Sequence, residues 1–149
     1  MYPLGHIALS YISGKIITKI TGKNFNTILI WIISVSPDLD LLIPGLVHRG
    51  ASHSIISAIV IFIPIFIIYE NAHPYLAALL SHSLIGDYFT IHGCKLFWPL
   101  RKTFYVSPLA WPVGSTFGIL VEVLLFALMI FIMRARSSIR KSRHPKTFT

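Results

Sequence analysis

The chain has 149 residues, of which 54% are hydrophobic and 12% are charged, and its mean hydropathy is +0.73. This composition excludes an ordinary soluble domain and indicates one integral membrane domain. The formal net charge of +8 does not indicate a nucleic-acid binder, because six of the thirteen Lys and Arg residues crowd into positions 134–146, directly after the last apolar segment.

The first two apolar segments are the weaker candidates for membrane helices. Residues 3–20 carry His6 near one end and Lys15 and Lys19 toward the other, so this segment either spans the membrane or lies in its interface. Residues 25–35 are apolar but few, and the sequence Ser-Pro-Asp-Leu-Asp at 36–40 separates them from a second apolar stretch at 41–47. We expect a broken or membrane-dipping helix there.

The later segments predict longer helices. Residues 55–69 predict a helix despite Pro64, because neighbouring helices can compensate for a kink, and residues 74–91 predict another that opens with Pro74. Residues 116–133 are interrupted only by Glu122 and are long enough to cross the hydrocarbon core. The predicted fold is an all-α integral membrane bundle of about four to five transmembrane or membrane-dipping helices. The membrane domain is predicted at 1–133 and a basic cytoplasmic tail at 134–149.

The basic residues predict the orientation, because positively charged flanks stay cytoplasmic. A multi-pass cell-membrane protein with a cytoplasmic C-terminus would hold nine Lys or Arg inside, at 15–23 and 134–146, and four outside. The same threading places a set of ionisable residues from separate segments together at the outer side: His6, Asp38, Asp40, His48, Arg49, His53, His82 and Asp87.

Three aspartates in or beside apolar segments need a compensating partner. At about 2.5 to 3.5 kcal/mol each on the insertion scale, Asp38, Asp40 and Asp87 together could cost roughly 9 kcal/mol. A divalent cation is the obvious candidate, because carboxylates and imidazoles are suitable ligands and metal binding can supply on the order of 10 kcal/mol.

The motif at 36–40 has two interpretations. Asp38 and Asp40 can converge on one ion if the backbone is extended or turning, and Pro37 disfavours a regular helix through them. Alternatively, Ser36 caps a helix that starts at Pro37, and the helix dipole favours Asp38 at its start.

The segment at 48–54 places two imidazoles and one guanidinium around Gly50. His48 and His53 suit zinc, manganese or iron, and Arg49 suits bidentate bonding to a phosphate oxygen. The alternative is a solvated loop in which Ser52 or Ser54 caps the next helix.

His82 and Asp87 lie in an otherwise apolar helix. Five residues apart, they point about 140° away from each other on a regular helix, so a π-bulge near Gly86 is needed to bring them together. Alternatively, His82 is hydrogen-bonded inside the bundle and Asp87 pairs with Arg49.

Taken in order, Gly5-His6, the 36–40 and 48–54 motifs, His82 with Asp87, and Gly93 through Trp98-Pro99 resemble one family, the LexA-binding, inner-membrane-associated hydrolases, also called membrane-bound metal-dependent hydrolases. The resemblance covers residues 5 to about 100 and implies a small α-helical membrane protein. It also implies that seven residues occupy the family's polar motif positions: His6, Asp38, Asp40, His48, His53, His82 and Asp87. The family usually spaces its helix His and Asp four apart, whereas the spacing here is five, and nothing in these residues indicates LexA binding.

The leading hypothesis is a metal-dependent hydrolase, phospholipase C-like or phosphatase-like, that cleaves a phosphoester in a membrane lipid or lipid-linked phosphate. Its catalytic residues are predicted to be Asp40, Arg49 and His48, with Asp40 as general base or bridging ligand and Arg49 as phosphate clamp. One or two ions, zinc before manganese or iron, are predicted to be bound by His6, Asp38, Asp40, His53, His82 and Asp87.

Two other functions stay open at this point. Intramembrane Asp and His residues also mark ion or proton conduits, although such sites usually lie near the midplane between repeats. A metal-stapled scaffold for another membrane protein is the other alternative. No nucleic-acid partner is expected, and the basic tail is expected to contact anionic lipids.

Overall fold

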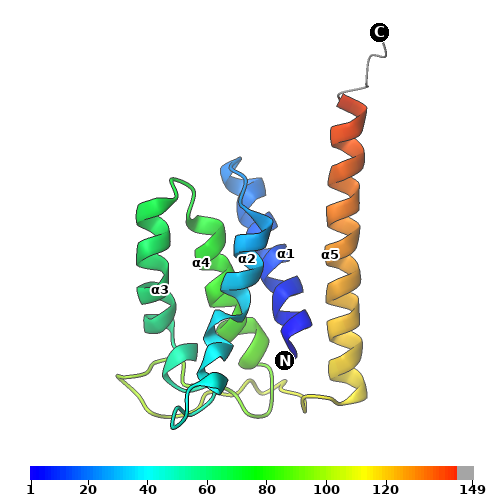
Figure 1. Ribbon diagram of the computed structural model, residues 1–149. Helices are drawn as coiled ribbons and strands as arrows, with labels where there is room; N and C mark the ends of the chain where they lie inside the picture. The colour runs from blue at the N-terminus through cyan, green and yellow to red at the C-terminus, as the bar shows by residue number, and fades with distance from the viewer. Residues whose placement is uncertain (144–149) are drawn as a thin grey trace.

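The computed structural model describes residues 1–143, which form five α-helices and three short helices and contain no β-strand (Figure 1). The short helices are of the 3-10 type for η1 and η2 and of the π type for η3. In chain order the elements are α1 (Pro3–Thr21), α2 (Thr27–Val35), η1 (Ser36–Leu42), η2 (Ala51–His53), α3 (Ile55–Ile68), α4 (His73–Ser81), η3 (His82–Asp87) and α5 (Thr116–Arg143).

Local sequence signals set the helix boundaries. Asn26 caps α2 by accepting hydrogen bonds from the backbone nitrogens of Ile28 and Leu29, and Ser54 caps α3 in the same way, accepting from that of Ser57. Helix α1 ends at Gly22, whose left-handed φ of 71° favours glycine. The capping role considered for Ser54 is therefore confirmed.

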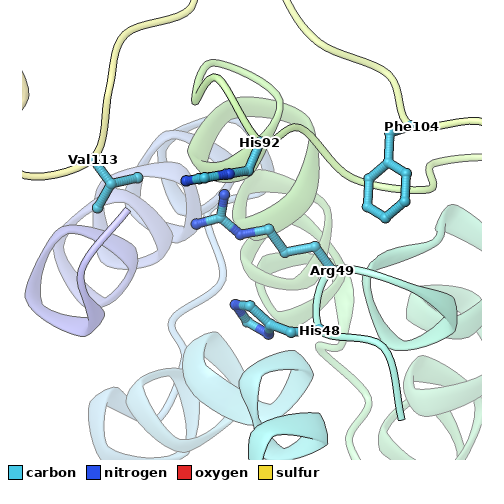
Figure 2. Close-up of a pocket in the computed structure, with 5 residues that line it drawn as sticks. All are labelled: His48, Arg49, His92, Phe104 and Val113. Carbon is cyan, nitrogen blue, oxygen red and sulfur yellow. The ribbon is translucent and has the colours of Figure 1, made fainter.

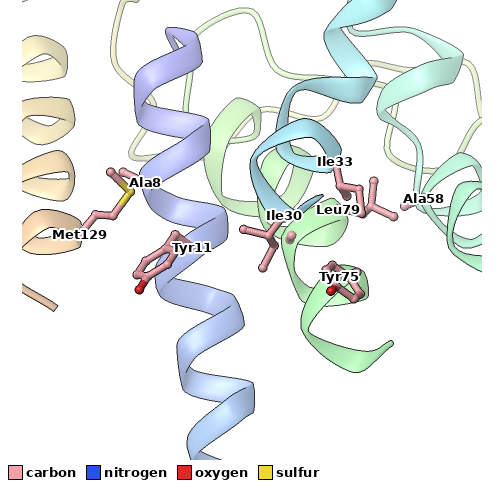
Figure 3. Close-up of a cluster of buried hydrophobic side chains, with 9 residues drawn as sticks. Ala8, Tyr11, Ile30, Ile33, Ala58, Tyr75, Leu79 and Met129 are labelled. Atoms are coloured by element: carbon pink, nitrogen blue, oxygen red, sulfur yellow. The ribbon is translucent and has the colours of Figure 1, made fainter. Parts of the chain in front are cut away.

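Helices α1 to α4 form a bundle, and α5 lies at its edge beside α1 (Figure 1). The bundle packs around one cluster of buried side chains, and Met129 joins α5 to it beside Ala8 of α1 (Figure 3). Glu122 of α5 accepts a hydrogen bond of 3.0 Å from the backbone nitrogen of Tyr2. The buried cluster comprises Ala8, Tyr11, Ile30, Ile33, Ala58, Tyr75, Ala78, Leu79 and Met129.

Among residues 1–143, one segment is long and apolar enough to cross a membrane, Thr116–Ala135 of α5. Its 20 residues rise about 30 Å, the thickness of the hydrocarbon core, and its side chains are mostly exposed. The all-helical fold class is confirmed, and the expected set of four to five membrane helices stays a prediction.

Three predicted boundaries differ from the structure. The apolar stretch at 41–47 is not a second helix, because η1 ends at Leu42 and exposed loop residues follow. The helix predicted at 74–91 stops at Asp87, where the Thr90 hydroxyl donates to the Asp87 carbonyl and competes with further helical bonding. Helix α5 continues past 133 to Arg143, and residues 144–149 of the predicted tail lie outside the described residues.

Candidate metal centre

The eight ionisable residues singled out in the sequence meet at one end of the bundle. In Figure 1 this is the lower end, where α1 begins, α2 ends, α3 begins and α4 ends. Charged and imidazole groups within 4 Å of each other link every one of them to at least one other: His6, Asp38, Asp40, His48, Arg49, His53, His82 and Asp87. The predicted convergence on one side of the bundle is confirmed.

Four of these residues surround one point. His53 Nε2 lies 3.2 Å from Asp38 Oδ1 and 3.1 Å from Asp87 Oδ2, and His82 Nε2 lies 3.5 and 3.4 Å from the same two oxygens. Ligands in a tetrahedral zinc site at 2.0 to 2.2 Å from the metal are roughly 3.3 to 3.6 Å apart. The spacing of these donors therefore fits a group that could hold a metal ion.

Hydrogen bonds fix the proton on each imidazole. His82 Nδ1 donates to the carbonyl oxygen of Ser34 over 2.6 Å. Ser52 uses its single hydroxyl proton for Asp40, so at 2.9 Å the Nδ1 of His53 must donate to the Ser52 oxygen. In their neutral forms both rings therefore direct an unprotonated Nε2 toward two carboxylates.

An imidazole lone pair and the carboxylate oxygen that it faces repel each other unless a cation or an added proton lies between them. Within residues 1–143, His82 Nε2 and Asp87 Oδ2 are buried atoms with no hydrogen-bond partner. Such buried, unpartnered atoms are costly unless a ligand satisfies them. The donor set of two imidazoles and two carboxylates thus fits a divalent cation.

The π-helix explains how His82 and Asp87 can face one point. Residues His82–Asp87 form η3, as predicted near Gly86, and the wider turn offsets the five-residue spacing. A Cβ on Gly86 would lie 2.5 Å from Cε1 of His6, so only glycine allows the close approach of α1. The alternative interpretation of this pair also holds, because His82 is hydrogen-bonded inside the bundle and Asp87 pairs with Arg49.

His6 lies beside the four-residue group and not within it. Its ring stacks on His82 with centroids 3.8 Å apart, and its Nε2 lies 3.6 Å from the outer oxygen of Asp87, Oδ1. This geometry supports His6 as a packing partner of a ligand, because the four closest donors come from other residues. The predicted ligand role of His6 stays a prediction without direct geometric support.

Asp40 organises the second half of the site. Its Oδ1 lies 2.8 Å from His48 Nδ1, and its Oδ2 accepts from the Arg49 backbone nitrogen and the Ser52 hydroxyl. With His48 and His53, Asp40 forms a second group that could hold a metal ion. Because its oxygens already accept three hydrogen bonds, Asp40 is better placed to orient His48 and, through Ser52, His53. Ser36 is the first residue of η1, which has Val35 as its N-cap, and the Ser36 hydroxyl donates to the Ile33 carbonyl, so the alternative of Ser36 as a helix N-cap is wrong.

Arg49 is buried between the metal group and a neighbouring loop. Its Nη2 lies 3.3 Å from Asp87 Oδ1, and its Nη1 donates to the Thr90 hydroxyl over 2.7 Å. Arg49 also has a left-handed φ of 61°, a strained conformation for a residue with a side chain, held by bonds from its backbone to Asp40 and Lys95. The fold thus fixes the guanidinium against Asp87.

The ionisation of the two loop-borne ligands follows from their contacts. Burial alone would raise the pKa of Asp38, but the adjacent imidazoles of His53 and His82, which can carry positive charge, outweigh it and lower that pKa. Burial alone would lower the pKa of His53, but Asp38 and Asp87 outweigh it and raise that pKa. Asp38 is therefore an anionic ligand at neutral pH, and a cation would displace the proton that His53 otherwise holds.

An open cavity of about 530 Å³ adjoins the metal group. It is lined by His48, Arg49, His92, Phe104 and Val113, and Figure 2 shows the Arg49 guanidinium between the two imidazoles in that view. Arg49 contacts Asp87, and the ring of His48 lies 5.2 Å from that of His53. The cavity therefore opens onto the metal ligands through Arg49 and His48.

Comparison with known proteins gives one match. The family model of the YdjM inner membrane protein matches residues 1–143. The chain belongs to this family. The comparisons with curated proteins and with solved structures found no match.

Membership of the YdjM family agrees with the predicted inner-membrane location at the level of the family. The metal-binding potential of this chain is supported by its own residues, in the group of Asp38, His53, His82 and Asp87. The individual roles of the site residues stay predictions.

Four contributors to this YdjM site were not predicted from the sequence: Ser34, Ser52 as a link to Asp40, Thr90 and His92. Ser34 acts through its backbone carbonyl, which no side-chain pattern reveals. Thr90 is a polar residue three positions after the candidate ligand Asp87, and this short spacing is the signal that could have identified it. His92 directly follows the helix predicted at 74–91 and belongs to none of the ligand motifs.

Proposed function

We propose that this protein is an inner-membrane, metal-dependent hydrolase that cleaves a phosphoester in a lipid or lipid-linked substrate. The observation that carries the proposal is the convergence of His53 Nε2 and His82 Nε2, each 3.1 to 3.5 Å from both Asp38 Oδ1 and Asp87 Oδ2, beside an arginine-lined cavity. Metal ligands next to a guanidinium are a typical arrangement for phosphoester chemistry.

The four ligands favour zinc, with manganese or iron as alternatives, because imidazole and carboxylate donors in a group of four suit zinc. The chemistry that a divalent cation supplies at such a centre is Lewis acidity, which polarises a phosphoryl oxygen and makes water a competent nucleophile near neutral pH. One ion accounts for this group, since the hydrogen bonds of Asp40 favour a positioning role for that residue.

The chain's own residues would position the substrate and move a proton. Arg49 would orient the phosphoryl group in the cavity and offset its negative charge. His48 donates Nδ1–H to Asp40 and, as a protonated imidazolium, would give its Nε2 proton to the leaving-group oxygen as the phosphorus–oxygen bond breaks. Asp40 thus takes the place of an orienting residue, in contrast to its predicted role as general base.

We further propose that the shorter helices enter the membrane beside α5, in a multi-pass arrangement with a cytoplasmic C-terminus. The exposed apolar side chains of α3 support this, among them Val60, Ile63 and Phe66. The metal group would then lie near the outer face, since α5 begins at the same end of the bundle (Figure 1), and the basic C-terminal residues would contact anionic lipids. A cluster of polar residues at one end of the bundle is also poorly placed for an ion or proton conduit, because such sites usually lie near the membrane midplane.

Turnover by purified protein tests the proposal. The full chain in detergent, loaded with zinc, is expected to hydrolyse phosphoesters of amphiphilic alcohols, and His53→Ala is expected to abolish both metal retention and turnover. The exposed His73→Gln, at the other end of α4, is the matched control. Tightly retained metal with no turnover on any phosphoester would contradict the hydrolase and support a metal-stapled scaffold.

A further inference from the structure

The cavity beside the metal group combines positive charge with a fixed, exposed histidine. Among the described residues that line it are Arg49, His48 and His92, and none of the lining residues is acidic. Lys95 adds a further cation next to this wall, because its ammonium lies 5.0 Å from the ring of Phe104 and its backbone nitrogen donates to the Arg49 carbonyl.

The guanidinium of Arg49 keeps donors available for a ligand. Thr90 takes one donor from Nη1 and Asp87 lies against Nη2, so each terminal nitrogen keeps a second N–H, while Nε is buried and has no hydrogen-bond partner within residues 1–143. A guanidinium carries five N–H donors, so contacts to Thr90 and Asp87 leave part of the fork unused. Arg49 can therefore bind an anion without releasing Asp87.

The backbone fixes His92 although its side chain is exposed. Gly93 donates to the Thr90 carbonyl over 2.9 Å and closes a turn around His92, while Ile91 donates to the Trp111 carbonyl. Gly93 has a left-handed φ of 57°, and a Cβ there would lie 2.2 Å from the Tyr105 carbonyl oxygen. This close approach holds His92 over the cavity, on the side of Arg49 that faces away from His48 in Figure 2.

We propose that this cavity binds the dianionic phosphoryl group of a phosphate monoester, and that His92 is a specificity-determining residue for it. This inference rests on the proposed function. A phosphate monoester carries a charge of about −1.5 to −2 near neutral pH, whereas a diester carries a single charge. The guanidinium of Arg49 and the two imidazoles that line the cavity, with the Lys95 ammonium beside Phe104, match the dianion better, because each donor then has a phosphoryl oxygen to contact.

Binding of two small probes tests the inference. In calorimetry on the zinc-loaded full chain in detergent, inorganic phosphate is expected to bind at least roughly tenfold more tightly than dimethyl phosphate. His92→Gln should weaken phosphate binding by roughly tenfold, the effect of losing one charge-assisted hydrogen bond, and leave dimethyl phosphate unchanged. His73→Gln, an exposed histidine at the far end, should change neither. Equal affinity for both probes, or an unchanged His92→Gln, overturns the inference.

Turnover separates this inference from the hydrolase proposal. If the protein hydrolyses amphiphilic phosphodiesters and leaves monoesters intact, the hydrolase stands and the monoester inference is wrong. If phosphate binds selectively and in a His92-dependent manner while neither ester is hydrolysed, the cavity assignment stands and the hydrolase is wrong.

Discussion

His82 donates its Nδ1 proton to the backbone carbonyl of Ser34 over 2.6 Å, across 48 positions of the chain. Ser34 lies in the last turn of α2, where helix carbonyls lack partners within their own helix. The bond satisfies that carbonyl and turns Nε2 of His82 toward Asp38 and Asp87. The break in α2 before Pro37 thus orients a candidate metal ligand on another helix.

Replacing Gly86 with alanine should disturb the site through His6. The new Cβ would lie 2.5 Å from Cε1 of the His6 ring, which stacks on His82, so the close packing of α1 against η3 must open. We expect Gly86→Ala to reduce the free energy of unfolding by about 1–3 kcal/mol, measured by denaturation in detergent. Removing the clashing ring should recover part of this loss, so the double variant Gly86→Ala/His6→Ala should be less destabilised than the sum of the two single variants. Additive effects would argue against the clash.

Asp40→Asn should reduce turnover and leave the metal bound. Asparagine carries no negative charge to stabilise a protonated His48 ring at Nδ1, so the imidazolium that would give its Nε2 proton to the leaving group is disfavoured. The expected loss in kcat is on the order of a hundredfold, a typical contribution of general acid catalysis, and it is measured together with metal content. Asp38→Asn is the comparison, because that change should release metal. Loss of metal from Asp40→Asn would show that Asp40 is a ligand.

Arg49→Ala should also keep the metal while impairing turnover. Its guanidinium touches the outer oxygen of Asp87 and lines the cavity, but it is not a donor to the cation. We expect kcat/KM to fall by about a hundredfold, as when one preorganised donor to the transition state is removed. Arg101→Ala, at an exposed loop position, should leave kcat/KM within about twofold of the unaltered protein. An equal effect of both variants would assign Arg49 no special role.

The single cysteine allows a direct test of membrane orientation. Cys94 is buried, and burial raises the pKa of its thiol to about 12, so at pH 8 the thiolate is scarce and alkylation should require unfolding. Single cysteines introduced at other positions can therefore be labelled without first replacing Cys94. An impermeant maleimide should label Lys102→Cys from outside intact cells, and Ser142→Cys only after the membrane is opened. The reverse pattern overturns the proposed orientation.

The sequence predicted the gathering of polar groups better than their individual roles. The convergence and the π-helix followed from two physical constraints, the cost of charges in apolar segments and the mismatch between the five-residue spacing of His82 and Asp87 and a regular helix. The roles of Asp40 and His6 depend on which atoms face each other, and spacing along the chain does not fix that. Ser34 contributes a carbonyl freed only by the end of a helix, which sequence composition does not reveal.

Metal content tests the central claim most directly. Elemental analysis of the detergent-purified full chain should find at least one transition metal ion per chain, with zinc expected, and Asp87→Asn or His53→Ala should lose it while His73→Gln retains it. Folded, metal-free protein whose unfolding is unaffected by added zinc would contradict the account. His53 and His82 would then be protonated partners of Asp38 and Asp87 in a buried ion-pair network.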